Sequence, residues 1–318
     1  MKDRQISQKM LQALQSGVLH PLLELIHHDQ TLDMELRGNS VNIYYRGGSL
    51  FTLKEESSNS FSIFFNSKYC NTILAKLYPK LSSTPSVDEA IQNLPFYKQA
   101  MDFWFSNHPK LEREIQQEIV TENNNHGNIS YGTDYYIVDI EYANSENNSR
   151  FDMVAIKWPS TSNGRQDGKE ATLALIELKY GDGSIKGDAG VEKHLQDSDT
   201  FLSASEKFSD FCSDMAQVFK QKCKLGLING IKEDRHPTIT TNNPELIFIF
   251  ANHKPASQKL KEEVKKLRSQ CIQWNIYYAT ASAMGYGLYA NQMKDIDKFL
   301  KALDQEPIKT APSIKENL

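Results

Sequence analysis

The order of apolar and polar residues changes its period several times along the chain, and each change predicts a new element. Residues 5–28 follow a helical pattern that Gly17 and Pro21 interrupt, so one or two helices are expected there. Polar and apolar residues then alternate, with many Ile, Tyr and Phe, between turn sequences such as RGN and RGGS. This period of two predicts an antiparallel meander. Its strands are expected at about 35–38, 41–54 and 60–66.

The second part of the chain begins with a helical pattern and continues as alternating strands and helices. A helix is expected over about 95–122. Within it, Leu111, Ile115 and Ile119 recur every four residues and predict one buried stripe. Three strands are expected next, at about 134–143, 150–158 and 172–180, and then a helical region over 191–225. The pattern continues with a strand at 244–254, a helix at 256–271, a strand at 274–282 and a closing helix at 295–305.

This order of elements predicts the fold class. Three consecutive strands favour antiparallel pairing, and the later strand–helix–strand steps favour parallel crossover pairing. We therefore expect an α/β protein with a mixed β-sheet flanked by helices, preceded by a helical and β-meander extension. The domains expected are the extension over residues 1–94, a core over 95–302 and a flexible tail over 303–318. The extension could help to select a substrate or form a dimer contact.

Composition and charge narrow the class of protein without indicating an activity. The chain has 318 residues, of which 39% are hydrophobic and 24% charged, as in globular proteins with a substantial core. It lacks an apolar stretch of about 18 residues, so we expect no transmembrane helix. The four cysteines form no CxxC pair, which argues against a zinc site and favours a reducing, cytoplasmic location. The net charge of −4 excludes a uniformly basic surface but allows a local basic patch.

An acid and a base share one face of an otherwise aliphatic strand. In LALIELKYGDGSIKG, Glu177 and Lys179 are two residues apart and project together, whereas Ile176 and Leu178 point the other way. Asp152 occurs in the apolar run FDMVAI of the preceding strand. If the two strands pair, Asp152 and Glu177 converge at one end of the sheet.

Two converging carboxylates repel when both are ionised, and a divalent cation relieves that repulsion. Oxygen ligands of this kind suit magnesium or manganese. A lysine beside such a cation can orient or deprotonate a water, or stabilise charge on a phosphoryl oxygen. The set therefore fits the attack of water on a phosphodiester.

An E-x-K triplet alone most often marks a solvated strand face, but its context here is more specific. A hydrophobic strand with an Asp is followed by a turn-rich loop, an aliphatic strand that ends in E-x-K, a glycine and a helix. This arrangement resembles the PD-(D/E)XK superfamily, the restriction endonuclease-like nucleases. The matching residues are Asp152, Glu177 and Lys179, and the resemblance covers about 95–255. Phe151 stands where a proline often precedes the Asp, which is a common departure in the superfamily.

The resemblance implies a restriction endonuclease-like core with a metal site. Asp152 and Glu177 would ligate one or two Mg²⁺ or Mn²⁺ ions, and Lys179 would position or activate water. A further metal-ligating Glu on the first core helix is implied, here Glu114 or Glu118. Glu118 is favoured because it lies nearer the helix end that leads into the strands. A helix-surface carboxylate is the alternative for both.

Other polar and aromatic residues near this pattern give weaker indications. The helix after E-x-K offers His194 as a further catalytic residue in contact with a phosphate or water, with a surface or capping histidine as the alternative. Asp139 and Glu141 share one strand face and are either additional site carboxylates or ion-pair partners of Arg150 and Lys157. The aromatic residues of VNIYYRGGSLF could stack on bases, but packing within the small sheet explains them more simply.

We therefore expect a metal-dependent nuclease that hydrolyses phosphodiester bonds of DNA or RNA, with DNA preferred and Mg²⁺ or Mn²⁺ as cofactor. It would act in the cytoplasm without a membrane partner and could form a homodimer. A part in defence or repair would rest on analogy with the superfamily. Two alternatives stay open. One is a catalytically inactive module of the same fold that binds nucleic acid or protein, and the other is an enzyme of another class in which E-x-K is a coincidence.

Overall fold

A computed structural model of the chain describes most of its residues. They are residues 4–57, 60–71, 81–125, 133–143, 150–187, 190–231, 235–252, 258–268, 274–281 and 293–304. The tail predicted for residues 303–318 therefore lies outside the described residues from residue 305 onward. Within these stretches, no helix is both long enough and apolar enough to cross a membrane.

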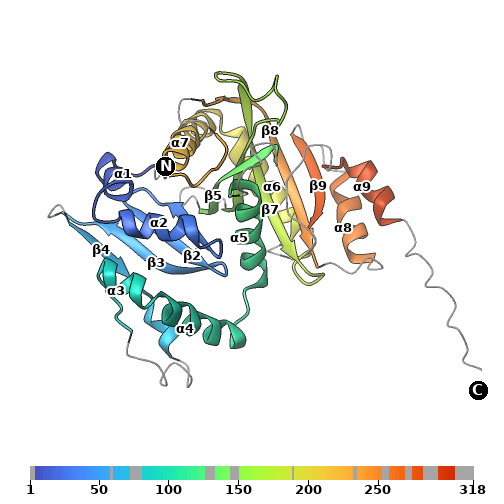
Figure 1. The fold of residues 1–318 in the computed structure, drawn as a ribbon. Coiled ribbons are helices and arrows are strands. Elements are labelled where there is room, and N and C mark those ends of the chain that lie inside the picture. Colours follow the sequence, from blue (N-terminus) through green and yellow to red (C-terminus); the bar gives the residue numbers. More distant parts are fainter. Residues whose placement is uncertain are drawn as a thin grey trace, which may run out of the picture.

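The N-terminal part of the described chain is an antiparallel sheet with the strand order β1-β2-β3-β4, accompanied by helices (Figure 1). Its elements are α1 (Gln8–Gln15), α2 (His20–His28), β1 (Leu32–Leu36), β2 (Ser40–Tyr45), β3 (Gly48–Glu55), β4 (Phe61–Phe64), the 3-10 helix η1 (Ser67–Cys70), α3 (Val87–Gln92) and α4 (Leu94–Asn107). Alternate strand residues such as Ile43 and Leu53 are buried in one cluster with Leu14 and Leu22 of the helices. The predicted meander is confirmed.

A second sheet forms the larger part of the described residues, with the order β5-β6-β7-β8-β9. β5, β6 and β7 pair antiparallel, whereas β7, β8 and β9 pair parallel. Its elements are α5 (Leu111–Asn124), β5 (Tyr135–Ala143), β6 (Arg150–Lys157), β7 (Glu170–Tyr180), α6 (Val191–Ser203), α7 (Ser205–Lys224), β8 (Thr238–Ala251), α8 (Gln258–Arg268), β9 (Asn275–Ala281) and α9 (Ile296–Leu303). The predicted mixed sheet flanked by helices is therefore confirmed.

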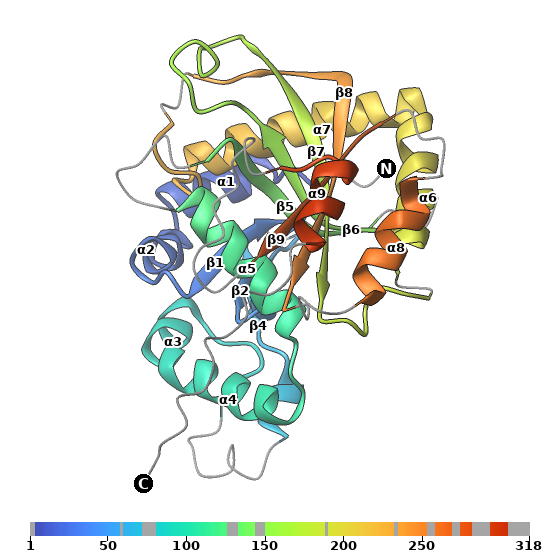
Figure 2. The ribbon, with the colours of Figure 1, turned by 90° about the vertical axis from the view of Figure 1, so that its right-hand side faces the viewer.

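Helices cover both faces of the mixed sheet (Figures 1 and 2). α5 covers one face, where Val120 is buried in a cluster with Ile176. α6, α7, α8 and α9 cover the other, where Phe211 and Leu260 are buried in a cluster with Leu175. Strands between two helical layers need apolar residues on both faces, which explains the apolar runs LALI in β7 and LIFIFA in β8.

Two predicted elements divide in the structure. The strand predicted over 41–54 is β2 and β3, joined by a turn at Arg46 and Gly47, whose φ angles are 50° and 68°. The helix predicted over 95–122 is α4 and α5. Pro109 separates them because a proline disfavours the helical conformation in the residue before it. α4 packs against β3 and η1, whereas α5 packs against β5 and β7.

The β2–β3 turn fastens the N-terminal sheet to α5. The Gly47 N–H donates a hydrogen bond to Gln117 Oε1 at 2.7 Å. A Cβ on Gly47 would lie 2.4 Å from the carbonyl carbon of Arg113, so this contact and the positive φ both require glycine. Arg46 binds Asp102 of α4 at 2.8 Å and Glu114 of α5 at 2.9 Å. The turn therefore binds both α4 and α5 close to where the two helices meet.

Buried charged residues also join the N-terminal sheet to the core. Lys222 Nζ of α7 donates to Glu35 Oε1 of β1 at 2.6 Å, and the side chains are 1% and 0% exposed. Asp139 of β5 pairs with Arg37 and lies 3.0 Å from Arg4 Nε. Breaking such a buried pair leaves an uncompensated charge. These pairs therefore favour a single arrangement of the two sheets.

Lys222→Met should lower the free energy of unfolding by about 3 kcal/mol, because the buried Glu35 carboxyl loses its hydrogen-bonded cation and keeps, among the described residues, only Arg37, 3.8 Å away. The matched control, Lys224→Met, changes an exposed lysine of the same helix. It should stay within about 0.5 kcal/mol of wild type. Urea unfolding followed by tryptophan fluorescence measures both variants. Equal losses would show that the buried pair does not hold the sheets together.

Candidate active site

Asp152 and Glu177 lie opposite each other on neighbouring strands. β6 and β7 are antiparallel with Met153 opposite Ile176, so the next position of that register pairs Asp152 with Glu177. Side chains at opposite positions project from the same face of the sheet. The Leu178 N–H donates to Asp152 Oδ2 at 2.8 Å. The structure thus brings together the two acids that the sequence pattern singled out.

Lys179 and His194 approach Glu177 from two elements. Lys179 shares its strand face, and its Nζ lies 3.5 Å from Glu177 Oε2. His194 Nδ1, in the first turn of α6, lies 3.1 Å from the same oxygen. A Cβ on Gly190 would lie 2.8 Å from the carbonyl oxygen of Ile185. This close backbone approach requires glycine and determines where α6, and with it His194, begins.

Glu177 is a buried carboxylate with unsatisfied oxygens. Its side chain is 1% exposed. Neither oxygen accepts a well-aligned hydrogen bond from the described residues, although Lys179 Nζ and His194 Nδ1 lie 3.5 Å and 3.1 Å from Oε2. Burial raises the pKa of Glu177 to about 7, and the Lys179 charge opposes this rise. Because buried polar groups normally have partners, these free oxygens indicate a place for a ligand.

The neighbouring titratable groups are shifted by the same burial. Burial and the Glu177 charge raise the pKa of Asp152 to about 7, while Lys179 and the Leu178 N–H oppose the rise. Burial, and then the Lys179 charge, lower the pKa of His194. This shift favours the neutral form of the imidazole. Two carboxyls that titrate near pH 7 beside a neutral imidazole can exchange protons or accept a cation.

Glu112 is the helix carboxylate of this site, and it was missed in the sequence analysis. It lies in the first turn of α5, where its Oε2 accepts a hydrogen bond from the Tyr180 N–H at 3.2 Å. Burial and the charge of Asp152 raise the pKa of Glu112, and the charge of Lys179 opposes the rise. α5 therefore brings a third carboxylate to the site, at the end of β7 and from the other face of the sheet.

Glu114 and Glu118, the predicted helix ligands, lie elsewhere. Glu114 pairs with Arg46 at 2.9 Å, and the Glu118 side chain is exposed. The preference for Glu118 was based on the wrong end of the helix. α5 presents its first turn to the carboxyl end of β7, whereas near its last turn Asn124 Nδ2 donates to the carbonyl oxygen of Ile137 in β5.

The spacing along α5 contained a signal for Glu112. Gln116 and Ile119 are buried against the sheet and follow Glu112 by four and seven residues, which places all three on one helix face. The prediction that Leu111 belongs to the buried stripe was wrong, since it is 42% exposed. Because Leu111 at the helix start is apolar, the pattern placed it in the buried stripe, whereas the neighbouring Glu112 is the residue that faces the sheet.

Asp139 and Glu141 lie outside the acid cluster. Asp139 takes part in the buried network with Arg37, and Glu141 Oε1 lies 2.6 Å from Arg113 Nε. Lys157, one of the expected partners, pairs with Glu245 instead. The two acids therefore join the N-terminal sheet and α5 to β5.

Within the described residues, no group of three or more His, Cys, Asp or Glu side chains is arranged to hold a metal ion. The donors that fit a hard divalent cation are the paired carboxylates of Asp152 and Glu177, because both Glu177 oxygens lack hydrogen bonds. Mg²⁺ usually keeps several waters and binds through one or two carboxylates. The pair supplies the number of carboxylates that such a site uses.

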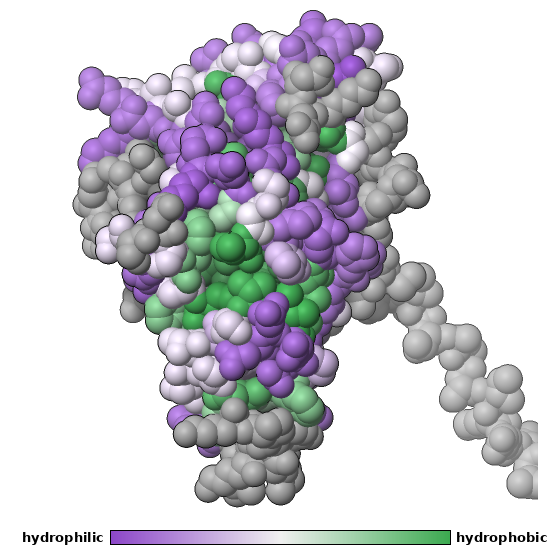
Figure 3. Space-filling view, turned by 60° about the vertical axis from the view of Figure 1, so that its left-hand side comes forward, coloured by the Kyte–Doolittle hydropathy of each residue, from purple (hydrophilic) through white to green (hydrophobic). Residues whose placement is uncertain are grey.

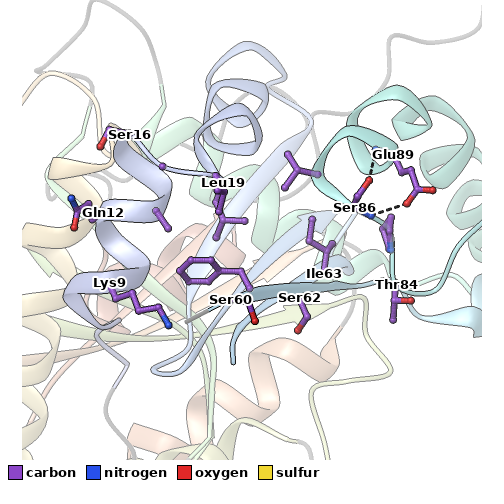
Figure 4. Close-up of a pocket in the computed structure, with 16 residues that line it drawn as sticks. Lys9, Gln12, Ser16, Leu19, Ser60, Ser62, Ile63, Thr84, Ser86 and Glu89 are labelled. Carbon is purple, nitrogen blue, oxygen red and sulfur yellow. Dashed lines mark hydrogen bonds between the residues drawn. The ribbon is translucent and has the colours of Figure 1, made fainter. Parts of the chain in front are cut away.

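A separate cavity of about 970 Å³ lies on the N-terminal sheet and is lined by none of these acids. α1, the turn after it, β4 and the start of α3 surround it (Figure 4). Leu19, Phe61 and Ile63 supply apolar walls, and Lys9 and Glu89 lie at its polar parts. Figure 3 shows hydrophobic surface on the side where these elements lie. Such a mixture is typical of a binding surface.

Comparisons of the chain with protein-family models, with curated proteins and with solved structures give no match. The functional argument therefore depends on the chemistry of the acid cluster itself.

The contribution of Asp152 and Glu177 to the stability of the metal-free protein should fall as the pH rises from about 4 to about 7. In this range the unfolded chain has released the protons of Asp152 and Glu177 that the folded chain keeps, because their pKa values are raised on folding. The double variant Asp152→Asn/Glu177→Gln lacks both titrations. Its free energy of unfolding, relative to wild type, should therefore increase by about 2 kcal/mol or more over that range.

Urea unfolding in EDTA at several pH values measures this difference between the variant and wild type. A difference that stays constant with pH would contradict the raised pKa values of the pair.

Proposed function

We propose that the chain is a metal-dependent phosphodiesterase with a restriction endonuclease-like core, a nuclease that acts on DNA or RNA. The observation that carries this proposal is the state of Glu177, which is buried with both oxygens unsatisfied, opposite Asp152 and beside Lys179. A carboxylate retained only for structure would be expected to have hydrogen-bond partners. Glu35, buried elsewhere in the same protein, accepts one from Lys222 at Oε1 and has one oxygen without a partner among the described residues, whereas Glu177 has two.

The proposed division of work follows from the positions of these residues. Asp152 and Glu177 would hold Mg²⁺ or Mn²⁺, and Glu112 adds negative charge beside them. The bound cation would polarise a phosphoryl oxygen and increase the acidity of a water. Lys179, held next to Glu177, would orient the attacking water and stabilise the negative charge that develops on the phosphate.

Proton movement in this proposal involves His194. Hydrolysis forms a bond from the water oxygen to phosphorus and breaks one P–O bond, with a proton lost from the water and one gained by the leaving oxygen. His194 Nδ1 lies 3.1 Å from Glu177 Oε2, and the lowered pKa of His194 favours the neutral ring, which can accept a proton at a ring nitrogen. His194 therefore serves to orient Glu177 and to receive a proton from the reacting water.

The order of elements supports the fold part of the proposal. α5, the antiparallel strands β5, β6 and β7, the helices α6 and α7 and the parallel strand β8 follow the helix, three strands, helix, strand order of restriction endonuclease-like cores. The preference for DNA, a homodimer and the cytoplasmic location stay predictions from the resemblance and the composition.

A second candidate function is binding without catalysis. The cavity between α1, β4 and α3 favours it, because apolar walls beside polar side chains suit recognition of a partner molecule. The two candidates differ in whether the acid cluster is needed for the activity of the protein.

Wild-type protein should cleave single- or double-stranded DNA or RNA with Mg²⁺ or Mn²⁺, and EDTA should abolish the cleavage. Glu177→Gln and Lys179→Met should each lower the rate about 100-fold or more, because they remove a cation donor and a charge stabiliser. The matched controls Glu118→Gln and Lys169→Met change exposed residues and should keep the wild-type rate. Gel assays of the four substrates measure these rates.

Inactivity of the wild type on all four substrates, together with no calorimetric sign of metal binding, would favour the binding module. Full activity of Glu177→Gln would place the reaction at another site.

A further inference from the structure

A groove on the outer face of the N-terminal sheet lies close to the candidate active site. Its volume is about 560 Å³, and β2, β3 and β4 line one side while η1, α4 and the start of α5 line the other. Asn42, Thr52 and Phe64 line it as one cross-strand row, because Thr52 is paired with both of the others. Residues on the opposite strand face, such as Ile43 and Leu53, are buried in the core. The row therefore lies on the outer side of the sheet.

Four positive side chains gather at this groove, namely Lys54, Lys68, Lys110 and Arg113. Burial lowers the pKa of Lys68, and the charges of Arg113 and Lys110 lower it further, so these three cations are close together. Within the part of the chain that the structure describes, no carboxylate pairs with the three lysines, whereas Arg113 pairs with Glu141 at the groove. Concentrated positive charge on a protein of net charge −4 favours a polyanionic ligand.

Aromatic rings lie among these cations. Lys68 Nζ lies 4.8 Å from the ring centroid of Tyr69 and 5.1 Å from that of Trp104. Lys54 Nζ lies 5.0 Å from the ring centroid of Phe64. Phe64 and Trp104 are partly exposed in the groove, although one face of Trp104 stacks on His108 with the ring centroids 4.3 Å apart. Ring faces beside cations suit the bases and phosphates of nucleic acid, and a base can reach a ring only when it is unstacked, which favours a single strand.

Asn42 adds an acceptor that a base could satisfy. Its Oδ1 is buried and has no hydrogen-bond partner among the described residues, while its Nδ2 donates to the Tyr44 hydroxyl at 3.4 Å. An unsatisfied buried acceptor is destabilising until a donor reaches it. The exocyclic amino groups of bases are donors of this kind.

The groove continues toward the acid cluster through the first turn of α5. Lys110 and Arg113 line both the groove and a smaller cavity of about 390 Å³, and Glu112 and Tyr180 also line the smaller cavity. Glu112 accepts a hydrogen bond from the N–H of Tyr180, the residue after Lys179, so the smaller cavity lies at the end of β7 that carries the acid cluster. A strand bound in the groove would therefore extend toward the residues proposed to react.

We propose that this groove binds a segment of single-stranded nucleic acid, with phosphates on its four cations and a base against Trp104. The segment would place an adjoining nucleotide at the acid cluster. That last step rests on the proposed nuclease function, but binding in the groove requires neither metal nor cleavage.

Fluorescence anisotropy with a labelled single-stranded DNA of about 20 nucleotides, in EDTA and with the full-length chain, measures this binding. The triple variant Lys54→Ala/Lys68→Ala/Lys110→Ala should raise the Kd about 10-fold or more. It should also lower the slope of log Kd against log salt by about 2, because each lost single-strand phosphate contact contributes about 0.7.

The matched control is Lys169→Ala/Lys224→Ala/Lys301→Ala, which removes three exposed lysines elsewhere and makes the same change in net charge. Its Kd should stay within about twofold of wild type. Equal losses in the two triple variants would overturn the proposal, as would an absence of single-strand binding by wild type.

Trp104→Leu should weaken single-strand binding about 10-fold without changing the salt slope, because a stacked base releases no counterions. A duplex of the same sequence should bind more weakly than the single strand. Duplex binding as tight as single-strand binding, with no effect of Trp104→Leu, would overturn the single-strand assignment. If circular dichroism shows Trp104→Leu to be unfolded, the lysine variants and the duplex comparison decide the question.

These experiments can reject the groove proposal and the nuclease proposal independently of each other. Groove-dependent binding, with no cleavage by wild type in Mg²⁺ or Mn²⁺, would uphold the groove and reject the nuclease. Unchanged Kd and unchanged cleavage in the Lys54/Lys68/Lys110 variant would reject the groove and leave the nuclease standing.

Discussion

The site depends on one constraint, namely that two carboxylates are buried opposite each other on neighbouring strands. Moving an ionised carboxylate out of water is costly, and a second one beside it increases the cost. Asp152 and Glu177 therefore destabilise the fold least when they are protonated or bound to a cation. Leu178, Lys179 and His194 hold the pair in place without satisfying the oxygens of Glu177. We propose that a bound cation relieves this cost.

The N-terminal sheet contacts α5, the helix that carries Glu112 to this site. The turn at Gly47 rests on the backbone of Arg113 and binds Gln117, and the buried Glu35–Lys222 pair joins the same sheet to α7 on the other side of the core. Neighbouring residues of the first turn of α5 then face different regions. Arg113 lines the basic groove, whereas Glu112 approaches the paired acids. The position of that single turn therefore links the groove to the acid cluster.

Sequence patterns predicted the features that depend on local periodicity. Alternation along β7 was enough to place Glu177 and Lys179 on one face, because strand geometry is set by neighbouring residues. The helix acid was missed because the face of α5 that meets the sheet depends on how the helix crosses it, so apolar Leu111 is exposed while Glu112 is not. The pairing of Asp139 with an arginine of the N-terminal sheet likewise joins residues distant in sequence, which no strand pattern displays.

Calorimetric titration of metal-free protein with Mn²⁺ tests the central claim most directly. At about pH 7, in two buffers of different ionisation enthalpy, wild type should bind Mn²⁺ and release protons, because carboxyls whose pKa values lie near 7 must ionise to coordinate a cation. Glu177→Gln should lose this binding, and Glu118→Gln should keep it. Equal binding by Glu177→Gln and wild type, or no binding by wild type, would contradict the claim that the buried pair is a metal centre.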